Sequence, residues 1–450
     1  MNKTKILDMT DGKIVPLLIK FSIPLLAGNL FQQLYNIVDS VVVGNFVGKE
    51  ALAAIGSTNQ IINSILGFFM GFATGGSVVV SQFFGGKNIP AMRKAIHTLI
   101  FSTVVLGVAF TLFGIALNPT FLSLMDTPQD VFHDANLYLT IYFEGIIFLM
   151  LYNIASGILR ALGNSRLPFI ALVLSSALNV GLDALFVIVL DFGIAGAGYA
   201  TIISEAFSAV FVLFFLFRTN EVYKLSLREM KVDFPILKRI VKLGLPGGFQ
   251  MSLTCFSNVF VQGYINKFGS DCMAGWASFN KIDQVCLLPM QSLSLASTTF
   301  AGQNYGAGKL ERAEKGILAS VLLAMCISFI VMLPTRIFSD ELVSLFNSDS
   351  GVVYYGTYFV KVCTAFYVIR CGTQIFAGGL RGLGNARAPM VILLCGFVAF
   401  RQLYLYVATH ITDAFFPVSI AYPVGWTFCS VTMFVYYLHF VRSQKRKSNL

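Results

Sequence analysis

Carboxylate, amide and hydroxyl side chains recur at helical spacing in the first half of the chain, inside runs that are otherwise apolar. Residues three, four or seven apart lie on one face of an α-helix, so these side chains form polar stripes. The stripes are Gln32, Tyr35, Asn36 and Asp39; Asn179 and Asp183; and Thr201 and Glu205. If a helical bundle brings these faces together, they form a hard-oxygen site that suits Na⁺ or a shared proton.

The apolar runs of the second half carry basic side chains instead. Arg370 and Gln374 are four residues apart and share a helical face, and Arg401 lies near the middle of the following run. Lys281 and Asp283 occur in one run, but a spacing of two directs them to different faces. Charges inside a membrane are costly and mark a functional site by default. We therefore interpret Arg370 and Arg401 as partners either of first-half acids or of an anionic group on a substrate.

The elements that position these residues are membrane-spanning helices. The 450 residues are 56% hydrophobic and 12% charged, whereas soluble domains are about 45–50% apolar and about 25% charged. A helix needs about 20 apolar residues to cross the hydrocarbon region. Twelve runs meet this need: 14–46, 52–84, 94–118, 131–158, 165–190, 194–218, 234–268, 273–303, 313–334, 352–379, 387–409 and 414–441. We predict an all-α integral membrane protein with twelve transmembrane helices.

A duplicated stretch divides the twelve runs into two sets of six. Residues 160–168 and 381–389 both follow the pattern R-x-L-G-N-x-R-x-P. Asn36 matches Asn258 in the same way, at an offset of 222 residues. Six helices per copy give both copies the same orientation, related by an axis along the membrane normal. The protein is thus predicted to form two pseudo-symmetric six-helix bundles with a substrate cavity between them.

The predicted domains follow from this duplication. They are a first lobe over 1–218, a cytoplasmic linker over 219–233 and a second lobe over 234–450. Pro24 lies inside the first run, where a proline removes a helical hydrogen bond and bends the helix. We interpret Pro24 as a hinge whose bend responds to ion binding.

The net charge of +10 is explained by orientation in the membrane. With the N-terminus in the cytoplasm, 25 basic residues fall in cytoplasmic segments and 3 on the opposite side. This asymmetry follows the positive-inside rule. It predicts a multi-pass protein of the cell (inner) membrane with both termini in the cytoplasm, and it requires no nucleic-acid partner.

The motifs of soluble enzymes are missing from the sequence. There is no GxxxxGK[ST] phosphate loop and no HExxH, the four His are scattered, and none of the eight Cys forms a CxxC pair. We predict no enzyme, no cofactor and no metal beyond Na⁺ at Asp39, Asn179 and Asp183. Without a nucleotide site, transport would draw its energy from an ion gradient.

Several of these features together resemble the multidrug and toxic compound extrusion (MATE) family, over essentially the whole chain. They are the six-plus-six helices, the repeated loop, Asp39 in the first run, Asn179-x-x-x-Asp183 in the fifth and Tyr422-Pro423-x-Gly425-Trp426 in the twelfth. The resemblance implies cation-coupled antiport through a V-shaped cleft between two lobes. It places the cation-coupling site on Asp39, Asn179, Asp183 and Thr201, with Tyr138 and Asn153 as neighbours.

We therefore predict an antiporter that exports amphipathic organic compounds in exchange for H⁺ or Na⁺, by alternating access between two lobes. Its partners would be a small-molecule substrate and the lipid bilayer, and the chain would be a monomer. The candidate cavity residues are Gln32, Tyr35, Asn36, Glu205, Asn258, Lys281, Asp283, Arg370, Gln374 and Arg401. The alternative is a lipid-linked precursor flippase, or an exporter of an anionic metabolite in the same superfamily, which the basic second half would suit. A third alternative is a receptor or scaffold that transports nothing. The sequence disfavours it, because such a protein would need neither buried acids nor duplicated halves.

Overall fold

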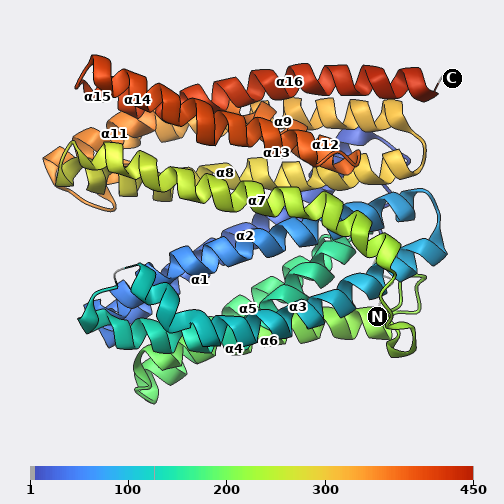
Figure 1. Cartoon of the computed structure of the whole chain (residues 1–450), viewed down its shortest axis with the longest axis horizontal. Helices are drawn as coiled ribbons and strands as arrows, with labels where there is room; N and C mark the ends of the chain where they lie inside the picture. Colours follow the sequence, from blue (N-terminus) through green and yellow to red (C-terminus); the bar gives the residue numbers. More distant parts are fainter. Residues whose placement is uncertain (1–5, 126, 449–450) are drawn as a thin grey trace. The chain divides into compact units, whose positions relative to one another are not determined.

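A computed structural model describes the backbone of residues 6–125 and 127–448. The side chains of residues 40, 49–50, 52–53, 57, 59–61, 63–64, 130 and 447–448 lie outside this description. Helices are the only regular elements in the described part of the chain (Figure 1). The predicted all-α class is confirmed, and each of the twelve predicted runs is helical over most of its length.

The helices of the first half are long and joined by short turns. They are α1 (Ile14–Val42), the π-helical turn η1 (Val43–Val47), α2 (Lys49–Gly85), α3 (Ile89–Leu124), α4 (Gln129–Ala161), α5 (Arg166–Asp183), the π-helical turn η2 (Ala184–Val189) and α6 (Gly193–Arg218). The linker after α6 contains a short 3₁₀ turn, η3 (Leu227–Glu229).

The second half has more breaks. Its helices are α7 (Phe234–Asn266), α8 (Ser270–Gly306), α9 (Leu310–Ile337), α10 (Ser339–Ser344), α11 (Ser350–Thr364), α12 (Tyr367–Gly382), α13 (Arg387–Leu394), the π-helical turn η4 (Cys395–Phe400), α14 (Arg401–Ile411), α15 (Phe415–Ser419) and α16 (Ala421–Ser448).

Length and apolar composition identify most of these helices as membrane spans. Within the described residues, nine helices are long and apolar enough to cross a membrane, and α11 with α12 forms a tenth span bent by 57°. The remaining two predicted spans, α7 and α8, are 33 and 37 residues long. They are too polar for the same criterion, and Asn258 and Asp283 are among the residues that make them so.

The chain folds into two compact units. Unit 1 comprises Met1–Asp8 and Ile23–Leu245, and unit 2 comprises Met9–Ser22 and Pro246–Leu450. The boundary between the units therefore runs through α1 and α7 rather than through a loop. Each of these helices contains a proline next to the boundary, Pro24 in α1 and Pro246 in α7.

Glycines and the linker attach the first turns of α7 to unit 1. A Cβ atom on Gly75 of α2 would lie 2.5 Å from the backbone nitrogen of Gly244, so the two helices cross with almost no space between them. The linker also packs on α3, where the Asp233 N–H donates to the Thr98 hydroxyl at 3.0 Å and Arg93 pairs with Glu229 at 2.7 Å.

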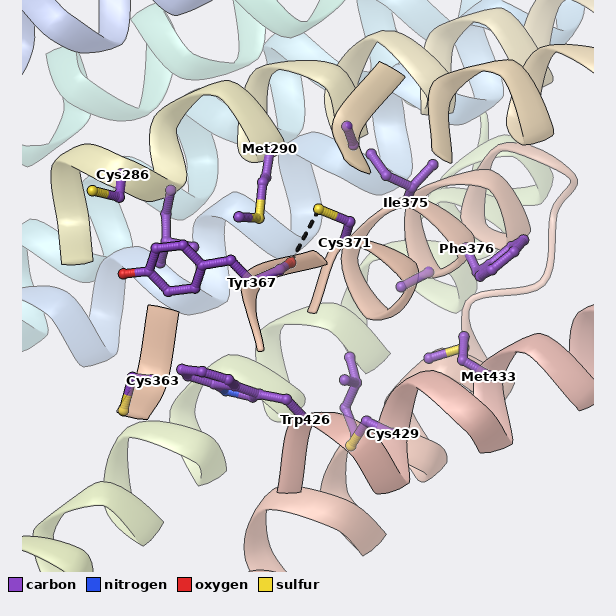
Figure 2. Close-up of a cluster of buried hydrophobic side chains, with 14 of the residues drawn as sticks. Cys286, Met290, Cys363, Tyr367, Cys371, Ile375, Phe376, Trp426, Cys429 and Met433 are labelled. Atoms are coloured by element: carbon purple, nitrogen blue, oxygen red, sulfur yellow. Dashed lines mark hydrogen bonds between the residues drawn. The ribbon is translucent and has the colours of Figure 1, made fainter. Parts of the chain in front are cut away.

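The core of unit 2 contains most of the cysteines. Figure 2 shows Cys286, Cys363, Cys371 and Cys429 among Met, Tyr and Trp side chains, and the Cys371 thiol donates to the Tyr367 carbonyl at 3.2 Å. All eight cysteines are free thiols. In this core they act as small packing residues.

Residues 9–12 are held in unit 2 by polar contacts with the end of α8 and the start of α9. The Met9 N–H donates to Gln303 at 3.0 Å, the Asn304 amide donates to the Met9 carbonyl at 3.0 Å, and Arg312 donates to the Gly12 carbonyl at 2.8 Å. Met9 is fully buried. These contacts fix the start of α1 in unit 2, although the rest of α1 belongs to unit 1.

Candidate functional site

The polar stripes of α1 and α5 meet inside unit 1. Asp183 and Asn179 are buried at the end of α5, and Asp39 is half-buried near the end of α1. The charges of Asp39 and Asp183 act on each other, and both act on the buried Tyr138 hydroxyl of α4. Helical spacing therefore identified three residues that the fold places in one neighbourhood, and the family resemblance identified Tyr138.

Several polar atoms of this group lack partners. Within the described part of the chain, no hydrogen-bond partner contacts Oδ1 of Asp39, either carboxylate oxygen of Asp183, or the side-chain oxygen and nitrogen of Asn179. Buried polar atoms are nearly always hydrogen-bonded, so a cluster of exceptions requires an explanation. An oxygen-rich group of this kind fits a small hard cation or a proton.

Ser176 is a further member that the sequence analysis missed. It is three residues before Asn179 on the same face of α5, it is buried, and its hydroxyl has no partner among the described residues. The signal that could have found it is the spacing of seven residues to Asp183.

The side chains of Thr201 and Asn153 form hydrogen bonds to backbone carbonyls of their own helices. The Thr201 hydroxyl donates to the Ala197 carbonyl at 3.0 Å, and the Asn153 amide donates to the Leu149 carbonyl at 2.9 Å. Such i to i−4 bonds leave the Thr201 and Asn153 oxygens free to accept, but they supply no contact to Asp39 or Asp183.

The other first-half candidates form a second polar group. The Glu205 charge acts on the hydroxyls of Tyr35 and Tyr142. Gln32 precedes Tyr35 by one turn on α1, and Asn36 is exposed. The Asp39 charge also acts on the Tyr35 hydroxyl. The group around Glu205 therefore lies next to the Asp39–Asp183 pair along α1.

In unit 2 the structure pairs Arg370 with Asp283. Arg370 Nη1 lies 3.1 and 3.2 Å from the two carboxylate oxygens, and the Tyr367 hydroxyl donates to Oδ1 at 2.7 Å. The guanidinium group also stacks over the Trp426 ring at 4.2 Å. The expected partner of Arg370 was a first-half acid or an anionic group on a substrate, and the first of these expectations is wrong, because the acid that pairs with Arg370 lies in the same half. Lys281 is exposed and lies over the Phe346 ring at 5.3 Å.

Arg401 has neutral partners. Its Nη2 donates to the Ser257 hydroxyl at 3.0 Å and to Oδ1 of Asn258 at 2.8 Å, and the guanidinium lies 4.7 Å from the centre of the Tyr422 ring. Arg401 is only 2% exposed, and no acidic side chain among the described residues of unit 2 forms a salt bridge with it. Gln374, the other predicted cavity residue of this half, accepts the Ser294 hydroxyl through its backbone carbonyl at 2.9 Å.

Three of the charged candidates adjoin π-helical turns. Asp183 immediately precedes η2, Arg401 immediately follows η4, and Asp39 lies one turn before η1. Single π-helical turns inside α-helices occur frequently at functional sites, because the extra residue re-aims neighbouring side chains. Among the described residues, no group of three or more His, Cys, Asp and Glu side chains could hold a metal ion. The group of Asp39, Asn179 and Asp183 contains only two acids, so it is not a metal centre of that kind.

Comparisons with known proteins identify a family that matches most of the chain. The MatE family profile matches residues 24–185 and 246–407, which is most of the chain and includes both copies of the repeat. The chain is 29% identical over 436 residues to the probable multidrug resistance protein YpnP of Bacillus subtilis (strain 168), covering 96% of this chain and 97% of that protein.

Two solved structures have the same fold. One is an outward-facing multidrug resistance MATE family transporter of the MOP superfamily, with a TM-score of 0.93, 23% identity and coverage of 99% of this chain and 100% of that one. The other is a MOP superfamily transporter from Pyrococcus furiosus Vc1 (DSM3638), with the same TM-score, identity and coverage, for which a reversed polarity of the binding pocket suggests a different function. Together with the family profile, the fold confirms the predicted family: this chain belongs to the multidrug and toxic compound extrusion (MATE) family of transporters.

Proposed function

We propose that this protein exports amphipathic organic compounds across the cell membrane in exchange for H⁺ or Na⁺. The observation that carries the proposal is the group of unpartnered polar atoms on Asp39, Asn179 and Asp183, taken over the described residues. Two carboxylates that act on each other repel when both are ionised, and a bound cation or proton removes that repulsion. Ion binding is thereby coupled to the distance between α1 and α5.

The hinge in this proposal is Pro24. A proline inside α1 removes one helical hydrogen bond, which makes the helix easier to bend at that point. Asp39 is fifteen residues further along the same helix. When an ion draws Asp39 toward Asp183, α1 bends about Pro24, and substrate bound beside its polar stripe of Gln32, Tyr35 and Asn36 is released.

Support for the substrate class comes from the relatives. YpnP is described as a probable multidrug resistance protein, and the outward-facing structure is of a multidrug resistance transporter. We extend this class to the present chain, acting as a monomer with both termini in the cytoplasm.

The experiment uses proteoliposomes with separately imposed pH and sodium gradients and a panel of fluorescent organic cations and zwitterions. The proposal expects one of the two gradients to drive uphill export. Export that requires neither gradient would overturn the coupling, and the absence of any transported compound would overturn the exporter assignment.

Arg401 favours a second candidate, an exporter of an anionic amphiphile such as a lipid-linked precursor. Among the described residues of its unit, the buried Arg401 guanidinium has only neutral hydrogen-bond partners, so no acid compensates its charge. An anionic headgroup near Asn258, which is exposed, would neutralise it. Arg401→Gln separates the two candidates: a loss confined to anionic substrates supports the second, and an equal loss for cations and anions contradicts it.

A further inference from the structure

Unit 1 contains an apolar groove that the transport proposal does not use. Its volume is about 360 Å³, and its walls come from α2, α3, the end of the linker and the first turns of α7. The lining includes Phe72, Phe101, Val105, Phe234 and Val241. Pockets of about 300–1,000 Å³ hold small organic ligands, so the groove is large enough for a hydrocarbon chain.

The groove opens on the outer surface of the bundle. Phe101, Val105 and Phe234 are 41%, 53% and 74% exposed. Both α3 and the start of α7 carry basic residues at this end, which the charge asymmetry assigns to the cytoplasm. In a membrane, such a surface faces the acyl chains of the cytoplasmic leaflet.

The length of the groove matches one leaflet. Its α7 wall extends from Phe234 to Leu245. At about 1.5 Å per residue this wall is about 17 Å long, roughly half of the about 30 Å hydrocarbon thickness. One acyl chain that enters from the headgroup region would therefore end where the groove ends.

Three lysines lie close to lining residues at the cytoplasmic end of the groove, in space or in sequence. The Lys94 side chain is 65% exposed, and its Nζ lies 3.5 Å from Asp233, the residue between lining residues Val232 and Phe234. Lys231 and Lys238 are exposed and adjacent in sequence to lining residues. Asp233 also caps α7 through the Ile236 N–H at 3.1 Å, so it neutralises at most part of this charge.

We propose that the groove binds one phospholipid with an anionic headgroup, its acyl chain along α7 and its phosphate among Lys94, Lys231 and Lys238. Lysines near an anionic membrane surface each contribute favourably to such binding, and their long side chains can extend to the headgroup level. The lipid chain would cover the open side of the α7 segment that Gly244 already holds against α2. Lipid binding would thus stabilise the attachment of α7 to unit 1.

Native mass spectrometry of the detergent-purified full chain tests this site, with phosphatidylglycerol or phosphatidylcholine of identical acyl chains added at equal concentration. Wild-type protein is expected to retain one phosphatidylglycerol at least tenfold more strongly than phosphatidylcholine. In Lys94→Gln/Lys238→Gln this preference is expected to fall about tenfold or more. The matched control is Lys267→Gln, which changes an exposed lysine directly after the last residue of α7 and is expected to keep the wild-type preference.

A second variant tests the groove itself. Val105→Trp places a bulky ring in the open side of the groove and is expected to lower retention of both lipids, while size-exclusion elution and thermal midpoint verify that the protein is folded. If that variant does not fold, Lys94→Glu/Lys238→Glu replaces it, with a larger loss of phosphatidylglycerol expected. Equal retention of the two lipids by wild-type protein, or an unchanged preference in the double lysine variant, would overturn the proposal.

Discussion

Asp283→Asn removes one charge from the buried ion pair of unit 2 and keeps the shape of the side chain. In the wild-type protein, Arg370 Nη1 contacts both carboxylate oxygens at 3.1 and 3.2 Å, and the two side chains are 15% and 14% exposed. Removing one partner of a buried pair costs about 3–5 kcal/mol, because the remaining charge stays buried without compensation. The Trp426 ring at 4.2 Å still stabilises the guanidinium, so we expect the lower end, about 3 kcal/mol.

The assay is thermal unfolding of the purified protein in detergent. For a unit of this size, about 1 kcal/mol shifts the midpoint by about 2–4 °C, so Asp283→Asn is expected to lower it by about 6–12 °C. The double variant Asp283→Asn/Arg370→Gln, which leaves no unpaired charge, is expected to recover most of the loss.

Asp340→Asn is the matched control, because it makes the same chemical change in the same unit. Its partner Lys361 is 3.8 Å away, and the two side chains are 63% and 47% exposed. Exposed pairs contribute about 0–1 kcal/mol, so the midpoint should move by only a few degrees at most. Equal shifts of the unfolding midpoint for Asp283→Asn and Asp340→Asn would show that the burial of the pair is not the cause. A double variant whose midpoint falls by the sum of the Asp283→Asn and Arg370→Gln shifts would also contradict the ion-pair explanation.

Two further predictions concern the helices that cross the boundary between the units. Gly75→Ala places a methyl group 2.5 Å from the Gly244 backbone and is expected to destabilise the protein by about 1–3 kcal/mol, measured by the same unfolding assay. Gly263→Ala, on an open face of α7, should be neutral or slightly stabilising, and a matching loss there would contradict the close-contact explanation. Pro24→Ala restores a helical hydrogen bond and should stabilise α1 while slowing export in proteoliposomes; wild-type export would contradict the hinge assignment.

Helical spacing was sufficient to predict the stripes on α1 and α5, because residues of one helix keep a fixed geometry whatever surrounds them. It also predicted every long helix from the apolar runs. The Asp283–Arg370 pair could not be predicted in this way, because its members are 87 residues apart and lie on different helices. Only the packing of α8 against α12 brings them together.

The local breaks in the helices could not be predicted from the sequence either. The bend between α11 and α12 occurs at Ala365 and Phe366, without the proline or glycine that would have indicated it. The turns η1, η2 and η4 insert one residue per turn without changing the apolar composition of their runs, so hydrophobicity gives no signal for them. The boundary inside α1 and α7 leaves no loop either, and only Pro24 and Pro246 mark it.

In the proposed mechanism, ion binding at Asp39 and Asp183 drives export, and transport by Asp183→Asn in proteoliposomes is the direct test of this coupling. The measurement compares uphill dye export under an imposed ion gradient with dye exchange at equilibrium. Asp191→Asn, at an exposed turn where the positive φ of 52° suits asparagine, is the control. Asp183→Asn is expected to abolish uphill export and to retain exchange, whereas uphill export at the wild-type rate would contradict the proposed coupling.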